Sequence, residues 1–86
     1  MSGERVAINT ADFWPEDAED VDEGVVVDWF AKEGKQIKED ETICVIQVEK
    51  VSIDIPAPVA GKIDEIALQE DDEFKRGDTL AWIQPE

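Results

Sequence analysis

The feature that most limits the fold of this chain is an internal repeat. When the segment Trp29–Ile46 is shifted by 37 positions, it falls without gaps on Ile66–Ile83. Four of the eighteen positions are identical, and every apolar position and every turn agrees between the two segments. Two similar halves built from short strands predict two sheets that pack face to face about a pseudo-twofold axis.

Short apolar runs separated by polar turns extend along most of the chain, and no segment has the period of a helix. We therefore predict an all-β fold, with isolated core residues at Ile37 and Phe74 and a loose terminus at Met1–Gly3. The predicted strands are Arg5–Trp14 at a sheet edge, Val25–Phe30, Ile43–Val48, Val51–Ile55, Lys62–Leu68 and Thr79–Ile83.

The strands Ile43–Val48 and Val51–Ile55 are separated by the single polar pair Glu49-Lys50. Such spacing predicts a hairpin with Lys50 at its tip, and because the pair is not Asn-Gly we expect a type I turn. Lys50 is the one cation between Lys38 and Lys62, in a chain rich in carboxylates. An exposed turn lysine without a function explains this stretch equally well.

Composition excludes several classes of function. The 86 residues suffice for one small domain, which we expect to fold over about residues 5–84. The absence of histidine excludes histidine bases and nucleophile–histidine pairs, and the lone cysteine, Cys44, is predicted to be a core residue. The sequence therefore predicts a non-catalytic module.

The net charge of −15 disfavours nucleic acid and anionic membranes as partners. No apolar run is long enough to span a membrane and no signal peptide opens the chain, so we expect a cytoplasmic protein. The acidic stretch Glu16–Glu23 does not have the spacing of a helix–loop–helix calcium site, so we predict a solvated loop with no metal.

These landmarks resemble the biotinyl/lipoyl attachment domains, and most of all the lipoyl domain of 2-oxo acid dehydrogenase complex acyltransferases. The resemblance runs from about Phe13 to Ile83. Its most specific part is a lysine at a hairpin tip, followed after five residues by the sequence P-A-P-V-A-G at Pro56–Gly61. The other matching residues are Pro15, Glu23-Gly24, Trp29, Lys32-Glu33-Gly34, Gly77-Asp78 and Leu80.

The resemblance implies a flattened β-barrel of two four-stranded antiparallel sheets. It also implies that Lys50 carries lipoic acid as a swinging arm, attached by a lipoate ligase or lipoyl transferase. The arm would move acyl groups and electrons between a thiamine-diphosphate 2-oxo acid decarboxylase, the acyltransferase core and dihydrolipoamide dehydrogenase. The domain itself would be a non-catalytic carrier, free-standing or part of an acyltransferase chain.

The chain departs from the family pattern at several positions. Glu49 and Val51 flank the lysine where the family usually has Asp and Ala, so the two residues that would contribute to recognition by the ligase are bulkier here. The family's Gly-Glu-Gly in the early loop, which contacts the decarboxylase, is replaced by Ala18-Glu19-Asp20, and Asp71 replaces a turn glycine.

Two alternative functions stay open. A biotin carrier domain of a carboxylase has the same fold, but that family typically flanks its lysine with methionines, and the one methionine here is Met1. An unmodified structural barrel would not use Lys50 at all. For Trp29 and Trp82 the sequence favours strand packing, and for Gly34, Gly61 and Gly77 it favours turns.

Overall fold

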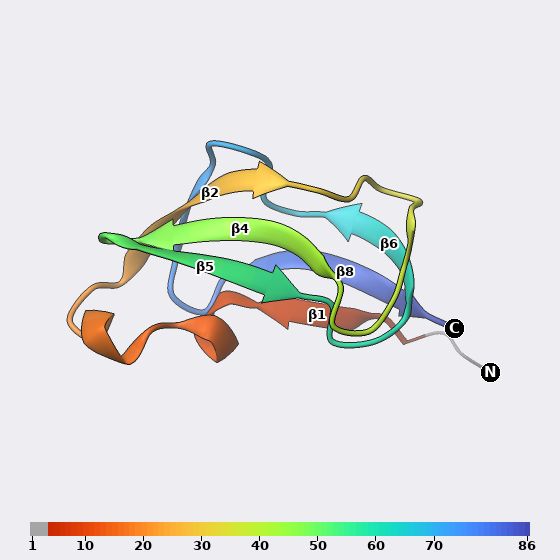
Figure 1. Ribbon diagram of the computed structural model, residues 1–86, viewed down its shortest axis with the longest axis horizontal. Helices are drawn as coiled ribbons and strands as arrows, with labels where there is room; N and C mark the ends of the chain where they lie inside the picture. Colours follow the sequence, from red (N-terminus) through yellow and green to blue (C-terminus); the bar gives the residue numbers. More distant parts are fainter. Residues whose placement is uncertain (1–3) are drawn as a thin grey trace.

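Eight strands form two antiparallel sheets of four that pack face to face in the computed structural model, which describes residues 4–86 (Figure 1). The all-β prediction is confirmed, while the prediction for Met1–Gly3 lies outside the described residues. The strands are β1 (Val6–Asn9), β2 (Glu23–Trp29), β3 (Gln36–Ile37), β4 (Thr42–Val48), β5 (Val51–Pro56), β6 (Gly61–Ile66), β7 (Glu73–Lys75) and β8 (Thr79–Pro85).

The two sheets have equivalent strand orders. One, which we call the tip sheet, has the order β5-β4-β2-β7, and the other, the terminal sheet, has the order β1-β8-β6-β3. A shift of 37 residues carries β2, β3 and β4 onto β6, β7 and β8, while β5 and β1 occupy equivalent edges. The bulge in β2 opposite β4 recurs in β6 opposite β8. The predicted repeat therefore extends to strand irregularities that the sequence alone does not reveal.

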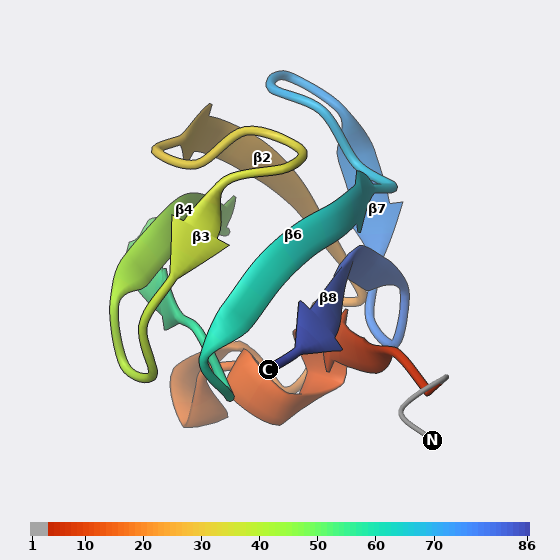
Figure 2. The same ribbon diagram turned by 90° about the vertical axis from the view of Figure 1, so that its right-hand side faces the viewer.

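Each half supplies a loop that completes a strand of the other half (Figure 2). The Gly34 amide donates to the Ile63 carbonyl at 2.7 Å, and the Asp71 amide donates to the Val26 carbonyl at 2.9 Å. Gly34 and Asp71 are repeat equivalents, as are Val26 and Ile63. The two halves are therefore exchanged across the axis and do not stand side by side as separate units.

Backbone geometry at the turns follows the repeat. Gly34 and Asp71 both have positive φ, of 88° and 70°, and Asp40 and Gly77 form a second such pair at 69° and 99°. In each pair only one member is glycine, so an aspartate adopts the left-handed conformation at the other. Asp71, which replaces a family glycine, thus retains the turn.

Close packing between neighbouring strands of each sheet explains a further pair of glycines, Gly24 in β2 and Gly61 in β6. A Cβ on Gly24 would lie 2.6 Å from the Phe74 ring, and a Cβ on Gly61 would lie 2.2 Å from the Gln84 carbonyl oxygen. Both distances are below van der Waals contact, so neither position accepts a side chain without local displacement.

The core lies between the sheets and is largely aliphatic. Its largest fully buried side chains are Ile8, Ile37, Ile43, Ile46, Ile55, Ile63, Leu80 and Ile83. Cys44 is fully buried among them, as predicted, and Phe74 is also buried. Buried residues alternate with outward-facing ones along much of the strands. The exceptions are the consecutive buried pairs Ile43-Cys44 in β4 and Leu80-Ala81 in β8, which are repeat equivalents.

The prediction of a strand over Arg5–Trp14 is wrong beyond Asn9. The chain continues in 3-10 turns at Thr10–Phe13 and Glu16–Ala18. The predicted loop Glu16–Glu23 therefore begins with a helical turn. The reason is tertiary: Thr10 is fully buried, and its hydroxyl donates to the Asp78 carbonyl at 2.9 Å and accepts the Gly77 amide at 3.0 Å.

Candidate functional site

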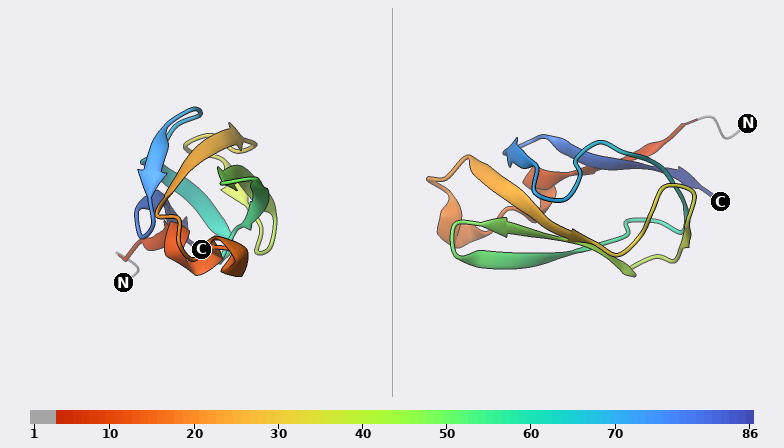
Figure 3. Two further views of the ribbon diagram at one scale, coloured as in Figure 1. Left: turned by 90° about the vertical axis from the view of Figure 1, so that its left-hand side faces the viewer. Right: turned by 90° about the horizontal axis from the view of Figure 1, so that it is seen from above.

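The β4–β5 hairpin projects at one end of the molecule, while the C-terminus lies at the other end (Figures 1 and 3). The longest dimension of the molecule is 40 Å. Ladder pairing runs along the hairpin to the pair Val48–Val51, so only Glu49 and Lys50 form the turn. The sequence therefore places Lys50 correctly at a hairpin tip.

The class of this turn differs from the prediction. Glu49 has a φ of 56°, whereas both central residues of a type I turn have negative φ. A positive φ at the first central residue is typical of the primed turns, whose twist matches that of the flanking strands. The Gln47 side chain donates to the Glu49 carbonyl at 3.0 Å and braces the turn. Because this contact depends on the turn geometry, no sequence signal identified Gln47.

Lys50 is exposed, and within residues 4–86 its ammonium group has no ion pair or side-chain hydrogen bond. Its neighbour Glu49 is also exposed, and Val51 is half-buried in the first pair of the ladder. An amine held in this way is accessible to a modifying enzyme, and the two rigid strands fix the position of its Cα. The arrangement suits covalent attachment better than binding in a pocket.

Carboxylates lie on one side of the hairpin, close to its turn. A shallow depression beside the turn is lined by Gly24, Val25, Gln47 and the acidic residues Glu23, Glu49 and Glu73. A partner that approaches Lys50 from this side would therefore meet negative charge, which favours a basic contact surface on that partner.

The segment between β1 and β2 lies at the same end of the molecule as the hairpin (Figures 1 and 3). Trp14 fixes its path, because the indole Nε1 donates to the carbonyls of Ala18 and Val21 at 3.0 and 2.9 Å. Ala18 is buried, whereas Glu19 and Asp20 are exposed. Of the three residues that replace the family's Gly-Glu-Gly, only the two acidic ones are available to a partner.

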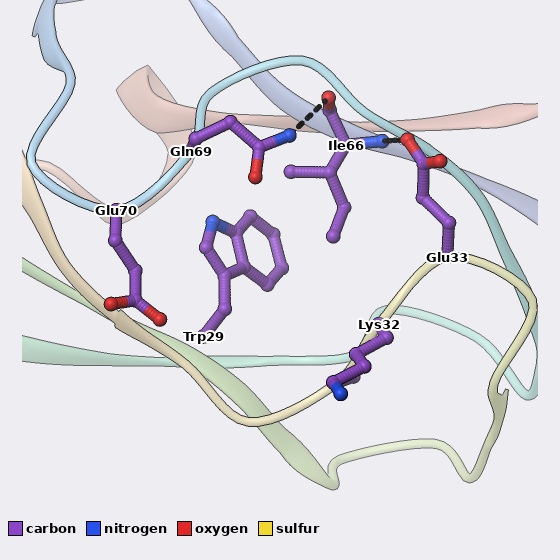
Figure 4. A pocket seen from close by; sticks show the side chains of 7 residues that line it. Trp29, Lys32, Glu33, Ile66, Gln69 and Glu70 are labelled. Carbon is purple, nitrogen blue, oxygen red and sulfur yellow. Dashed lines mark hydrogen bonds between the residues drawn. The ribbon is translucent and has the colours of Figure 1, made fainter.

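A hollow of about 530 Å³ is distinct from the hairpin (Figure 4). Its lining consists largely of repeat equivalents, with Trp29 opposite Ile66 and Glu33 opposite Glu70, so it marks the junction of the two halves. The Trp29 indole donates to the Leu68 carbonyl at 2.7 Å, and Glu33 accepts the Ile66 amide at 2.9 Å. These bonds join the halves, as the predicted packing role of Trp29 requires.

The one cysteine of the chain, Cys44, is buried in the core. Burial raises the pKa of the Cys44 thiol to about 12, so the thiol is protonated at neutral pH and unreactive. Within the described part of the chain, no three carboxylates or other metal-ligating side chains come together. Among residues 4–86, no helix is long and apolar enough to cross a membrane.

Comparison with known proteins agrees with this geometry. A family model described as "Biotin-requiring enzyme", for biotin and lipoyl attachment, matches residues 14–83. The chain belongs to the biotin/lipoyl attachment family. Within this family, the lipoyl domain of the 2-oxoglutarate dehydrogenase complex from Azotobacter vinelandii superposes with a TM-score of 0.74 and 31% identity, over 91% of this chain and 94% of that one.

Several longer proteins also match. A dihydrolipoyllysine-residue acetyltransferase component of the pyruvate dehydrogenase complex from Staphylococcus aureus is 35% identical over 69 residues, and the corresponding Staphylococcus epidermidis protein has the same identity. The match covers 80% of this chain but only 16% of those proteins. A single-chain, multi-domain long-chain acyl-CoA carboxylase superposes with a TM-score of 0.78, over all of this chain and 8% of that one; at 17% identity it bears on the fold alone. The chain is thus a carrier-type domain homologous to the lipoyl domains of dehydrogenase complexes.

Proposed function

We propose that this chain is a lipoyl carrier domain and that Lys50 is its attachment site. The observation that carries the proposal is the isolated Lys50 amine, exposed on a two-residue turn in a member of the biotin/lipoyl attachment family. Relatives at 35% and 31% identity are described as a dihydrolipoyllysine-residue acetyltransferase and a lipoyl domain. Both descriptions favour lipoate over biotin.

The residues of the tip fit such a group. Because the Lys50 amine has no partner within residues 4–86, acylation would break no ion pair and would only remove one positive charge. When bound, lipoic acid supplies a dithiolane that takes up acyl groups and electrons. The chain's own contribution is mechanical and electrostatic: the β4–β5 ladder orients the lysine, Gln47 braces the turn, and Glu49 and Val51 flank the amine for recognition by a lipoate ligase or lipoyl transferase.

The partners follow from this role as part of the same proposal. They are a thiamine-diphosphate 2-oxo acid decarboxylase, an acyltransferase core and dihydrolipoamide dehydrogenase, with the domain acting as a non-catalytic carrier between them in the cytoplasm. We further propose that residues 5–84 form the independently folding unit. Neither nucleic acid nor a membrane is part of this role.

Intact-mass measurement after co-expression with a lipoate ligase tests the attachment site. We expect the mass of one lipoyl group on the wild-type chain, none on Lys50→Arg, and full modification of the matched control Lys62→Arg, because Lys62 is also exposed but lies within β6. Modification of Lys50→Arg would contradict the site. A streptavidin-reactive product, or no acylation of the wild-type chain, would favour the biotin carrier or the structural barrel instead.

A further inference from the structure

The outer faces of the two sheets are covered differently. On the terminal sheet, Trp82 faces outward and the Arg5 guanidinium lies over it, with 4.6 Å from the guanidinium carbon to the ring centroid. The same guanidinium contacts Asp64 at 2.8 Å and Glu65 at 3.1 Å. One arginine thus covers the Trp82 ring and pairs with two carboxylates, so the outward apolar side chain and the neighbouring charges both have a partner within the chain.

The register identifies the equivalent positions on the tip sheet. Trp82 pairs with Glu65 on one side and Ala7 on the other, and its equivalent Val45 pairs in the same way with Asp28 and Asp54. The position of Arg5, one residue before β1, corresponds to Ser52 in β5, which pairs with Gln47. The remaining equivalents are Val27 for Asp64, Val25 for Lys62 and Phe30 for Ala67.

The tip sheet therefore has no counterpart of the Arg5 cover. Phe30 and Val27 are 53% and 43% exposed, which makes them the two exposed large apolar side chains of residues 4–86. We call Val25, Val27, Phe30 and Val45 the valine face.

The carboxylates that flank the valine face also lack the ion pairs that are present on the terminal sheet. Asp28 and Asp54 lie on either side of Val45 in the ladder, and neither forms an ion pair within residues 4–86. The cation nearest to them in the sheet is Lys75 in the edge strand β7, where it pairs with Glu23. An uncovered apolar strip with unmatched carboxylates on both sides is a typical interaction surface.

We propose that the valine face docks a segment of a partner protein in which arginine stands between apolar side chains. The terminal sheet supplies the template: an arginine stem over the apolar strip, with its guanidinium over Val45 and beside Asp28, the equivalent of Glu65. Asp54, whose equivalent on the terminal sheet is Ala7, adds a second carboxylate on the other side of Val45. A second copy of this chain is disfavoured as the occupant, because two chains that each carry a net charge of −15 repel each other. The proposal is independent of whether Lys50 is modified.

The test uses a synthetic peptide in which arginine alternates with leucine, titrated into the 86-residue chain and followed by amide NMR shifts. Two control peptides replace leucine by serine or arginine by glutamate. We expect shifts concentrated on Val25–Phe30, Val45 and Asp54, and binding about tenfold tighter than for either control. Equal affinity for the arginine–serine peptide, or shifts centred on Trp82, would overturn the proposal.

Two substitutions sharpen the test. Ser52→Arg introduces the missing guanidinium and is expected to weaken binding of the arginine–leucine peptide about tenfold, because the chain would then cover its own face. Phe30→Ser should weaken binding to a similar extent, whereas its repeat equivalent, the matched control Ala67→Ser, should leave it unchanged. All three positions are at the surface, so urea midpoints near that of the wild type show that folding is intact.

Unchanged affinity in both Ser52→Arg and Phe30→Ser would remove the valine face as the docking site. The alternative occupant is a second copy of the chain, so the oligomeric state of the free chain is measured by sedimentation. A monomer supports the proposal, whereas a dimer that Ser52→Arg dissociates would identify a second copy as the occupant and overturn it.

Discussion

The two ends of the molecule are equivalent in architecture but differ in how they are completed. At one end, β4 and β5 are joined by the turn Glu49-Lys50. At the other, their equivalents β8 and β1 pair along a similar ladder but are not consecutive in the chain, and Glu86 occupies the position that corresponds to Glu49. We call the end with the β4–β5 turn the closed end, and the end where β8 and β1 are not joined by a turn the open end. An amine is displayed at the closed end, whereas the open end brings together two separate segments of the chain. The comparison indicates that the turn, more than the strands, defines the candidate site.

The largest expected effect comes from moving the lysine within the turn. In the double variant Lys50→Val with Val51→Lys, the amine moves into the first ladder pair, and neighbouring strand residues face opposite sides. We expect lipoylation by a lipoate ligase to fall by about a hundredfold, since a small misplacement of a reacting group has effects of that size. Intact mass over a time course measures the rate.

The open end provides the control for this prediction. Glu86→Lys combined with Lys50→Arg places a lysine at the equivalent of the first turn position, but without a turn, and it should stay unmodified. Efficient lipoylation there, or in the shifted variant, would show that the closed turn is not required.

The second effect concerns Gly24 and Gly61, where a neighbouring strand of the same sheet leaves no room for a side chain. Gly61→Ala should destabilise the fold by roughly 3 kcal/mol, because the new Cβ would lie 2.2 Å from the backbone oxygen of Gln84. Gly24→Ala should cost less, about 1–2 kcal/mol, since its nearest contact at 2.6 Å is the outer part of the Phe74 ring, which can shift. Urea denaturation measures both, and the reverse order would contradict this account.

A smaller effect, which stabilises the fold, is expected from a substitution in the β4–β5 turn. Asparagine tolerates positive φ better than glutamate, so Glu49→Asn should raise the free energy of unfolding by roughly 0.5–1 kcal/mol. Glu86→Asn, at the equivalent position of the open end, should bring no comparable gain, because Glu86 does not have positive φ. Equal changes in the urea midpoints of the two variants would indicate a general charge effect instead.

The smallest effect is a pH dependence at the turn before β4. The backbone amide of Lys38 donates to Glu41 at 3.0 Å and lowers the pKa of that carboxyl, and Lys35 contributes further. A lowered pKa in the folded state adds stability above the unfolded pKa, which is lost as the pH falls through the folded value. The difference in urea midpoint between the wild type and Glu41→Gln should therefore be largest near neutral pH and vanish in acid. The adjacent control Glu39→Gln, whose side chain makes no hydrogen bond within residues 4–86, should show no such trend.

Local patterns predicted the parts of the fold that depend on local chemistry. The repeat located the paired strands, and the polar pair Glu49-Lys50 located the hairpin tip, because alternation and turn residues are encoded within a few positions. The 3-10 turns after Asn9 were missed because they depend on Thr10, whose partners lie 67 and 68 positions away. The positive φ of Glu49 was missed because the strand twist, and not the residue type, imposes it.

The uncovered valine face was also invisible in the sequence. The shift of 37 positions aligns Val25, Val27 and Val45 with Lys62, Asp64 and Trp82. Only the register shows that these residues lie in neighbouring strands of one sheet, with Val45 between Asp28 and Asp54. Likewise, the contact of Arg5 with Asp64 and Glu65 joins residues 59 and 60 positions apart. The repeat aligns the two halves residue by residue, but the structure is needed to show which residues of distant segments lie next to each other.

The crossed hydrogen bonds of Gly34 with Ile63 and of Asp71 with Val26 bear on how such an architecture could arise. A peptide that contained one half alone would lack the loop that completes its first strand, β2 or β6, and the exposed amides and carbonyls of that strand would pair with another copy. The smallest closed version of this design thus contains two copies of the motif, on one polypeptide or on two. A self-pairing ancestor of half the present length, later fused end to end, would satisfy that requirement at every step.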